Sequence, residues 1–407
     1  MQEEKFSLRK IAIPAFGPSI LFGAAEGAIY PVIPTTSTSL GASLALASLI
    51  VSIIGIGSLL ANVPASLFTF KYGEKKAIIG ASLISATAMA LFLYVHNLII
   101  FIIANLMVGI AQSVFNLARQ AYLTEVVPVD MRATALSTLG GSMRIGVFIG
   151  PFIGAATMNF MGIKGAYVVG LVVSLGALAI AVFLPDLHIK RKRVVNTEKT
   201  TFKYIFKDNL RVFATIGIGI LAVSAVRASR QVIIPLWGHY IGLDPKVTSM
   251  IYGISGAIDM LLFYPAGKVM DRFGRRWVSI PAMLIMTVGF IIMPFTHSAG
   301  MLTIAALLLG FGNGVSSGLV MTLGADYSPA EGRAKFLGIW RFLQDFGSSA
   351  GPLIISGLTA LISLGAGISS AGILGIVAAS VLGYWTPILA KEKTEKAKAA
   401  RKDKNSP

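Results

Sequence analysis

The sequence predicts an all-α integral membrane protein in which twelve transmembrane helices form two pseudo-symmetric six-helix bundles. Three observations support this: hydrophobic residues make up 55% and charged residues 13% of 407 positions, apolar segments of spanning length recur along the chain, and the sequence repeats internally. A spanning helix needs roughly 20 apolar residues, so twelve of them with short connections use most of the chain. Lipid is therefore the expected solvent for most of the molecule.

Short polar turns separate the apolar segments, whose ends are predicted to within a few residues. The expected spans are 11–35, 44–69, 77–95, 97–122, 134–158, 163–184, 209–240, 246–270, 277–296, 299–325, 334–362 and 367–390.

One long polar interruption divides the chain. It contains Pro185 and the basic run from Lys190 to Arg193. The expected organisation is an N-terminal bundle over 1–184, a basic linker over 185–208, a C-terminal bundle over 209–390 and a Lys-rich tail over 391–407.

The basic residues follow membrane topology. A net charge of +17 could by itself suit nucleic acid, but the loops at Lys71, Arg132 and Arg272, the linker and the tail all fall on one side of the expected membrane. The other side receives Lys164 and Lys246. Because basic loops stay in the cytoplasm, we expect a multi-pass cell-membrane protein with both termini cytoplasmic, contacting lipid and no nucleic acid.

Several chemistries are not expected. The chain contains no Cys, which excludes disulfides and thiolate sites, and its four His residues are far apart, so no metal site is expected. It has no G-x-x-x-x-G-K-[ST] loop for an ATP-driven pump and no recognisable catalytic constellation, so we expect no enzyme.

A shift of 201 residues superposes the two halves without a gap. The prolines and arginines decide this, because glycine is abundant throughout the sequence. The superposed pairs include Pro34 with Pro235, Pro64-Ala65 with Pro265-Ala266, Gly73 with Gly274, Gly109 with Gly310, Pro128 with Pro329, Arg132-Ala133 with Arg333-Ala334, Gly146 with Gly347, and Gly150-Pro151 with Gly351-Pro352. The sequence therefore predicts a duplicated six-helix unit.

A short loop after the eighth expected span carries a family signature. The loop residues are Gly267, Asp271, Arg272, Gly274, Arg275 and Arg276. This G-x-x-x-D-R-x-G-R-R pattern closely resembles the signature loop of the major facilitator superfamily, and the twelve spans and the repeat agree with it.

The resemblance implies a cytoplasmic gate in which this loop holds the two halves together in the outward-facing state. Asp326 and Glu331 are the candidate acids for its arginines. The matching loop of the first half has Phe70 where the family has Asp, so the second-half loop is expected to carry most of this role.

The fifth expected span contains a glycine–proline motif that resembles the G-x-x-x-G-P-x-x-G motif of the family's antiporters. Its residues are Gly146, Gly150, Pro151 and Gly154. Glycines allow a partner helix to pack closely and proline bends the helix, so close packing without any bearing on transport direction is the alternative reading.

Ionisable residues inside the expected spans are candidates for proton coupling or for the substrate cavity, because charges at bilayer depth are costly. They are Glu26, Arg144, Arg227, Arg230, Asp259 and Asp345. At the 201-residue lag, Glu26 corresponds to Arg227 and Arg144 to Asp345, with the sign reversed each time. We therefore expect two buried pairs, Glu26 with Arg144 and Arg227 with Asp345, with Asp259 as a competitor for Arg144.

The chain most resembles the drug:proton antiporter branch of the family. That resemblance implies a secondary active transporter that works by alternating access and exports amphipathic small molecules, driven by a proton gradient without a cofactor. A monomer is expected. The alternatives are transport of an organic anion by the intramembrane arginines, and a lipid flippase of the same fold.

Overall fold

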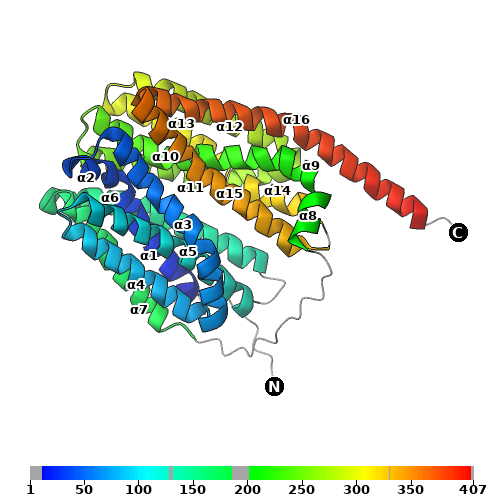
Figure 1. The fold of residues 1–407 in the computed structure, drawn as a ribbon, viewed down its shortest axis with the longest axis horizontal. Helices are drawn as coiled ribbons and strands as arrows, with labels where there is room; N and C mark the ends of the chain where they lie inside the picture. The colour runs from blue at the N-terminus through cyan, green and yellow to red at the C-terminus, as the bar shows by residue number, and fades with distance from the viewer. Residues whose placement is uncertain (1–11, 128–131, 186–200, 330, 405–407) are drawn as a thin grey trace.

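Long helices run back and forth between two ends of the molecule (Figure 1). The computed structural model describes residues 12–127, 132–185, 201–329 and 331–404. Residues 186–200 of the expected linker are not among the described residues. The same holds for residues 1–11 of the expected N-terminal bundle and residues 405–407 of the expected tail.

Six transmembrane segments form the N-terminal half. The first is α1 (Ala12–Ile29), which continues through the 3-10 turn η1 (Tyr30–Val32) into α2 (Ile33–Ser39). The others are α3 (Leu44–Tyr72), α4 (Glu74–Leu93), α5 (Leu98–Val126), α6 (Arg132–Met161) and α7 (Lys164–Val182).

The C-terminal half repeats this order after α8 (Phe202–Asp208), which lies in the expected linker. Its first segment is α9 (Leu210–Val212), the π-helical turn η3 (Phe213–Gly217) and α10 (Ile218–Tyr240). The others are α11 (Pro245–Phe273), α12 (Arg276–Ile292) with η4 (Met293–Phe295), α13 (Ala299–Val315) followed by α14 (Leu319–Tyr327), α15 (Arg333–Leu361) and α16 (Leu364–Lys404). Figure 1 shows α16 extending well beyond the bundle.

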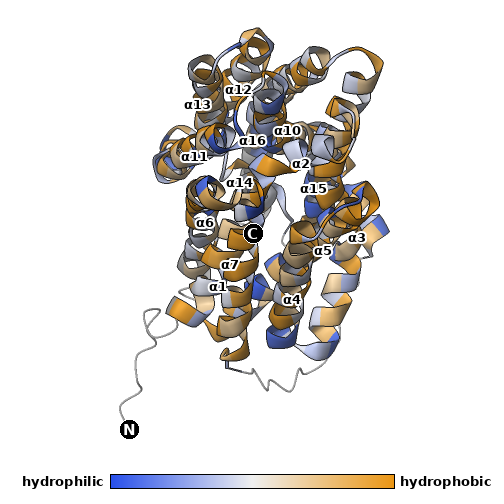
Figure 2. Cartoon of the chain, turned by 90° about the vertical axis from the view of Figure 1, so that its left-hand side faces the viewer, coloured by the Kyte–Doolittle hydropathy of each residue, from blue (hydrophilic) through white to orange (hydrophobic). Residues whose placement is uncertain are grey.

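The described residues contain eleven segments long and apolar enough to cross a membrane. The twelfth is α15, which has the length, at 29 residues, but is more polar because it carries Arg341, Gln344 and Asp345. Hydrophobic residues dominate the helices (Figure 2). The all-α membrane fold expected from the sequence is confirmed.

The two halves share one packing scheme. In the N-terminal half α1 packs against α6 and α7, α3 against α5, and α4 against α5 and α7. In the C-terminal half α10 packs against α15 and α16, α11 against α13, and α12 against α13 and α16. Across the interface α6 packs against α11 and α3 against α15. The halves are therefore pseudo-symmetric in contacts as well as in sequence.

A very close approach between two helices of the N-terminal half lies at two glycines of α6. A Cβ on Gly146 would overlap the carbonyl oxygen of Ile20, and one on Gly150 would overlap that of Ala24. Only glycine lets α6 come this near the backbone of α1.

The C-terminal half repeats this contact at the expected lag. A Cβ on Gly347 would overlap the carbonyl oxygen of Leu221, and one on Gly351 would overlap that of Ala225. Each of these residues stands 201 positions after its counterpart. The sequence repeat is thus a repeat of atomic contacts.

Two turns also repeat their backbone conformation. Gly41 and Gly242 have φ of 91° and 76°, and Gly73 and Gly274 have φ of 88° and 93°. Both pairs are 201 residues apart, and such positive φ values favour glycine. The Gly41 and Gly242 turns lie at one end of the molecule. The Gly73 and Gly274 turns, with the signature loop, lie at the other, which is called the basic end below.

Gly146→Ala is expected to lower the apparent Tm of the detergent-solubilised protein, because its Cβ has no room; overpacking of this kind costs about 1–3 kcal/mol. Gly141→Ala is the matched control, since a Cβ there meets nothing within 4 Å and both substitutions gain the same helix propensity. Equal Tm values for the two variants would contradict the packing argument.

Candidate functional site

A cavity of about 490 Å³ lies between the two halves. The helices α3, α5 and α6 line it from one half, and α10, α11, α13 and α15 line it from the other. Most of its lining side chains are polar, and they include Ser52, Asn62, Gln112, Asn116, Gln231, Asn313, Gln344 and Ser348. A cavity of this size and position suits a small-molecule ligand.

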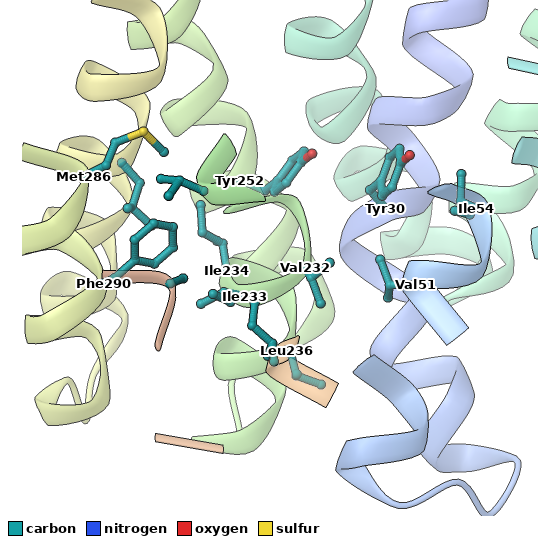
Figure 3. Close-up of a cluster of buried hydrophobic side chains, with 14 of the residues drawn as sticks. Tyr30, Val51, Ile54, Val232, Ile233, Ile234, Leu236, Tyr252, Met286 and Phe290 are labelled. Atoms are coloured by element: carbon teal, nitrogen blue, oxygen red, sulfur yellow. The ribbon is translucent and has the colours of Figure 1, made fainter. Parts of the chain in front are cut away.

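The cavity also has an apolar portion. Tyr30 and Val51 of the N-terminal half and Val232 and Tyr252 of the C-terminal half line it, and all four are buried. Figure 3 shows the first two on one side and the last two on the other. Both halves therefore contribute to a surface on which an apolar group can pack.

The end opposite the basic end is closed by contacts between the halves. The Thr38 hydroxyl and His239 Nε2 lie 2.8 Å apart, and these two residues are themselves 201 positions apart. The Ser356 hydroxyl donates to the carbonyl oxygen of Ala45 at 2.9 Å. These hydrogen bonds join α2 to α10 and α3 to α15 at this end.

The halves separate toward the basic end. A Cβ on Gly253 of α11 would lie 2.7 Å from the ring of Phe152 on α6, so these helices touch in the closed portion. Farther along, a Cβ on Gly140 or Gly141 of α6, or on Gly267 of α11, would meet nothing within 4 Å. Because Gly140 also lines the cavity, the cavity is open toward the basic end at this point.

Asp259 of α11 is the centre of a polar network in the cavity wall. Its Oδ1 accepts a hydrogen bond from Arg144 Nη1 at 2.9 Å across the interface. Its Oδ2 accepts from Asn313 Nδ2 at 2.7 Å and from Arg230 Nη1 at 3.4 Å. Asn313 in turn accepts from Arg227 Nε at 2.9 Å. One carboxylate thus serves two arginines and, through Asn313, orients a third.

This network differs from the two expected pairs. Arg144 contacts Asp259 rather than Glu26, because α6 lies against α11 and directs its side chain across the interface. The expected competition of Asp259 for Arg144 is confirmed. Arg227 is bound to Asn313 rather than to Asp345, because its side chain faces α13.

Asp345 lies on the other interface, where α15 meets α3. Its Oδ2 accepts a hydrogen bond from Asn62 Nδ2 at 2.8 Å, and Asn62 Oδ1 accepts from the Ser113 hydroxyl at 2.7 Å. Arg341 Nε lies 4.0 Å from the same carboxylate oxygen. Asp345 therefore links the two halves through an amide.

Glu26 lies behind the cavity wall. The residue is 5% exposed, and its Oε1 has no hydrogen-bond partner among the described residues. Gln112 and Arg119 of α5 are the polar side chains that act on its carboxyl group. The Glu26 and Gln112 positions correspond to Arg227 and Asn313 at the 201-residue lag. Each half thus places one charged residue of its first segment beside an amide of its fourth.

The signature loop makes its main ion pair within the C-terminal half. Arg275 donates from Nε and Nη2 to the two carboxylate oxygens of Asp326, at 2.6 and 3.1 Å. These hydrogen bonds raise the pKa of the Arg275 guanidinium above its usual value. The expected partnership with Asp326 is confirmed, whereas Glu331 is exposed.

The other loop residues lie at the surface of the basic end. Asp271, Arg272 and Arg276 are exposed, and Gly274 provides the positive φ at the end of α11. Gly267 faces open space. The loop belongs to the end at which the halves are apart.

The glycine–proline motif of α6 serves helix packing. Gly146 and Gly150 touch the α1 backbone, Gly154 makes ordinary contact with Ala28, and Pro151 is buried inside α6. The structure thus provides a packing role for the motif.

Sequence reasoning missed the uncharged and peripheral members of the site. Asn62, Gln112 and Asn313 are amides that each bind one charged residue, namely Asp345, Glu26 and Arg227. Arg119, which was not among the predicted site residues, lines the cavity with Arg341. The available signal was the 201-residue correspondence of Gln112 with Asn313 inside apolar segments.

Thr38→Cys combined with His239→Cys is expected to allow a short bifunctional thiol reagent to join the halves, because the two side chains touch. The native chain has no Cys to compete. Joining this end should stop transport in proteoliposomes, since the contact must break for the cavity to open there. Each single variant is the control, and undiminished transport by the cross-linked protein would contradict a moving gate.

Asp259→Asn is expected to lower the apparent Tm, because Arg144 and Arg230 lose their shared counter-charge. Breaking such a pair costs about 3 kcal/mol where it is buried and less where water screens it. Asp271→Asn, at an exposed position, is the control. A Tm unchanged by Asp259→Asn would show that the network contributes nothing to stability.

Known proteins resemble this chain in sequence and in structure. A family model described as Major Facilitator Superfamily matches residues 17–229 and 216–407. A multi-drug resistance efflux pump PmrA homolog of Lactococcus lactis is 24% identical over 320 residues, covering 75% of this chain and 76% of that protein. The multi-drug resistance efflux pump PmrA of Streptococcus pneumoniae is 24% identical over 359 residues, covering 84% and 87%.

Solved structures share the fold. A bacterial homolog of the human lysosomal transporter Spinster, in an inward-facing and unoccupied conformation, has a TM-score of 0.71 at 12% identity, covering 92% of this chain and 95% of that one. The human organic anion transporter MFSD10 has a TM-score of 0.69 at 15% identity, covering 93% and 100%. With its twelve-segment, twice-repeated architecture and the family model matching both halves, the chain belongs to the major facilitator superfamily and is similar to its drug:proton antiporter branch.

Proposed function

We propose that this chain transports amphipathic organic anions by alternating access. The observation that carries the proposal is the charge of the cavity wall. Five arginines line it, against the two acids Asp259 and Asp345, an excess of three positive charges: Arg119, Arg144, Arg227, Arg230 and Arg341. Guanidinium groups bind carboxylate, sulfonate and phosphate groups through paired hydrogen bonds.

The rest of the cavity fits the other part of such a molecule. Tyr30, Val51, Val232 and Tyr252 offer an apolar surface on which a ring or an alkyl group can pack. The volume of about 490 Å³ is in the range of small-molecule sites. A molecule with one anionic and one apolar end therefore matches the cavity better than a cation does.

The shape of the cavity supports alternating access. It opens toward the basic end and is closed at the other by the Thr38–His239 and Ser356–Ala45 contacts. Because basic loops remain in the cytoplasm, the open end is proposed to be cytoplasmic and the conformation to be inward-facing. Transport then requires that the contacts at the two ends form alternately.

Proton-coupled export of amphipathic compounds, the function expected from the sequence, is the second candidate. Two observations favour it: the efflux-pump names of the relatives, and the buried Glu26, whose carboxyl group has an unpaired oxygen beside Arg119. Protonation would remove a buried charge, which makes Glu26 the proposed proton carrier. The proton gradient is then the energy source.

The two candidates differ in the sign of proton movement. An anion that binds Arg119 removes the counter-charge of the Glu26 carboxylate. That carboxylate should then take up a proton as the anion binds. In drug:proton exchange the substrate displaces a proton, so binding should cause proton release. The pH of a weakly buffered detergent solution, recorded as naphthalenesulfonate is added to the purified protein, separates them. The starting pH is set near the midpoint of the Glu26 titration, so that the carboxyl group can both gain and lose a proton.

We expect proton uptake with the native protein and none with Glu26→Gln. Glu331→Gln, at an exposed position, is the control and should behave as the native protein does. Proton release would support exchange instead. No binding of naphthalenesulfonate, together with binding of an amphipathic cation, would overturn the anion proposal.

A further inference from the structure

Arg119 has donors that nothing in the described structure uses. It projects from α5 into the cavity lining, and its Nε and Nη1 have no hydrogen-bond partner among the described residues. Its guanidinium carbon lies 5.6 Å from the centre of the Phe115 ring. Phe115 is itself fixed, stacked on Phe22 at 4.2 Å. The side chain is thus held in place while its donors remain unpaired, which is costly unless a ligand completes it.

Arg341 approaches the same place from the other half. It projects from α15, and its Nη1 donates at 3.4 Å to Oε1 of Gln120, the residue next to Arg119 on α5. Its side chain is 50% exposed and lines the same cavity. The two guanidinium groups lie close enough for their charges to act on each other. The two halves therefore bring two like charges to the same part of the cavity.

The other arginines of the cavity already have partners. Arg144 and Arg230 share Asp259, and Arg227 binds Asn313. The acids nearest the first pair are Glu26, which acts on Arg119, and Asp345, which lies 4.0 Å from Arg341 and is also bound by Asn62. Neither acid forms a bidentate pair with Arg119 or Arg341 among the described residues. Arg119 keeps two donors without a partner among the described residues, and Arg341 is half-exposed and held by a long hydrogen bond to Gln120, so both can turn donors to an anion.

Resting on the proposed function, we infer that Arg119 and Arg341 together bind the anionic group of the substrate, a carboxylate, sulfonate or phosphate. The anion bridges the two halves of the molecule. Without it, repulsion between the guanidinium groups favours separation at the basic end. With it, each guanidinium is attracted to the shared anion, which draws α5 and α15 together and favours closure of that end. Substrate binding and the conformational change are then the same electrostatic event.

Binding of naphthalenesulfonate and of neutral naphthalenesulfonamide to the full-length purified protein tests this site. Arg119→Gln and Arg341→Gln are each expected to weaken sulfonate binding about tenfold, which corresponds to about 1.4 kcal/mol, and to leave sulfonamide binding unchanged. The double variant should be little weaker than either single one, because both arginines act on one group. Arg211→Gln, at a surface pair with Glu392, is the matched control.

Sulfate added as a competitor shows whether the charged group alone suffices. If sulfate competes strongly with naphthalenesulfonate, the site binds oxyanions in general. If sulfate competes weakly, the site binds anions that also carry an apolar group. In both cases the proposal holds only if Arg119→Gln and Arg341→Gln each weaken binding of the sulfonate. Retained sulfonamide binding shows that a variant is folded.

A distance measurement gives a second readout. Spin labels on Thr124→Cys of α5 and Phe342→Cys of α15 should move closer when the sulfonate is added and should not respond to the sulfonamide. Arg119→Gln and Arg341→Gln should abolish this shortening. Two results would overturn the shared site without contradicting the proposed transport of anions. One is sulfonate binding as strong in both single variants as in the native protein, and the other is a loss of binding free energy in the double variant equal to the sum of the two single losses. Absence of sulfonate binding in the native protein would instead reject the proposed function.

Discussion

Lipid gives a peptide group no hydrogen-bond partner, and the rest of the architecture follows from that constraint. Each segment must satisfy its own backbone, so the described chain crosses the membrane as helices. Because lipid is as apolar as the side chains, burial of apolar surface cannot drive the helices together, and close contact of backbones takes its place. Gly146 and Gly150 against α1, and Gly347 and Gly351 against α10, are the points where this contact is made.

The same solvent makes every intramembrane charge depend on a partner, and here the duplication has diverged. The scaffold contacts are identical in kind in both halves, whereas the charged positions are not: Glu26 stands where the other half has Arg227, and Arg144 where it has Asp345. Different amides bind these unequal charges: Asn62 binds Asp345, Gln112 binds Glu26 and Asn313 binds Arg227. Symmetry therefore governs how the helices pack, and its loss at the cavity allows one wall to differ chemically from the other.

The sequence predicted most of the fold. Periodic apolar segments and the lag of 201 residues predicted the number of spans and the duplication, because helix packing depends on residues that are near one another in each repeat. The limits of the spans were predicted to within a few residues except at α16, which continues to Lys404 through most of the expected tail. The partners in the site were harder to predict. Arg144 and Asp259 meet across the interface, 115 residues apart, and which acid an arginine reaches depends on the rotation of α6 against α11. The partner of Arg275 was easier to predict. The signature loop indicated that its arginines pair with acids at neighbouring helix ends, and Asp326 was one of the two candidates.

The polarity of α15 has a consequence for how the molecule is made. Arg341 and Asp345 lie one turn apart in a helix that is too polar to rank with the other eleven spans. Each such charge at the centre of a bilayer costs about 2.5–3.5 kcal/mol when a segment enters the membrane alone. The partners of α15, Asn62 on α3 and Gln120 on α5, belong to the half synthesised first. During synthesis the completed N-terminal bundle can thus act as an intramolecular chaperone, receiving a helix that lipid alone would reject.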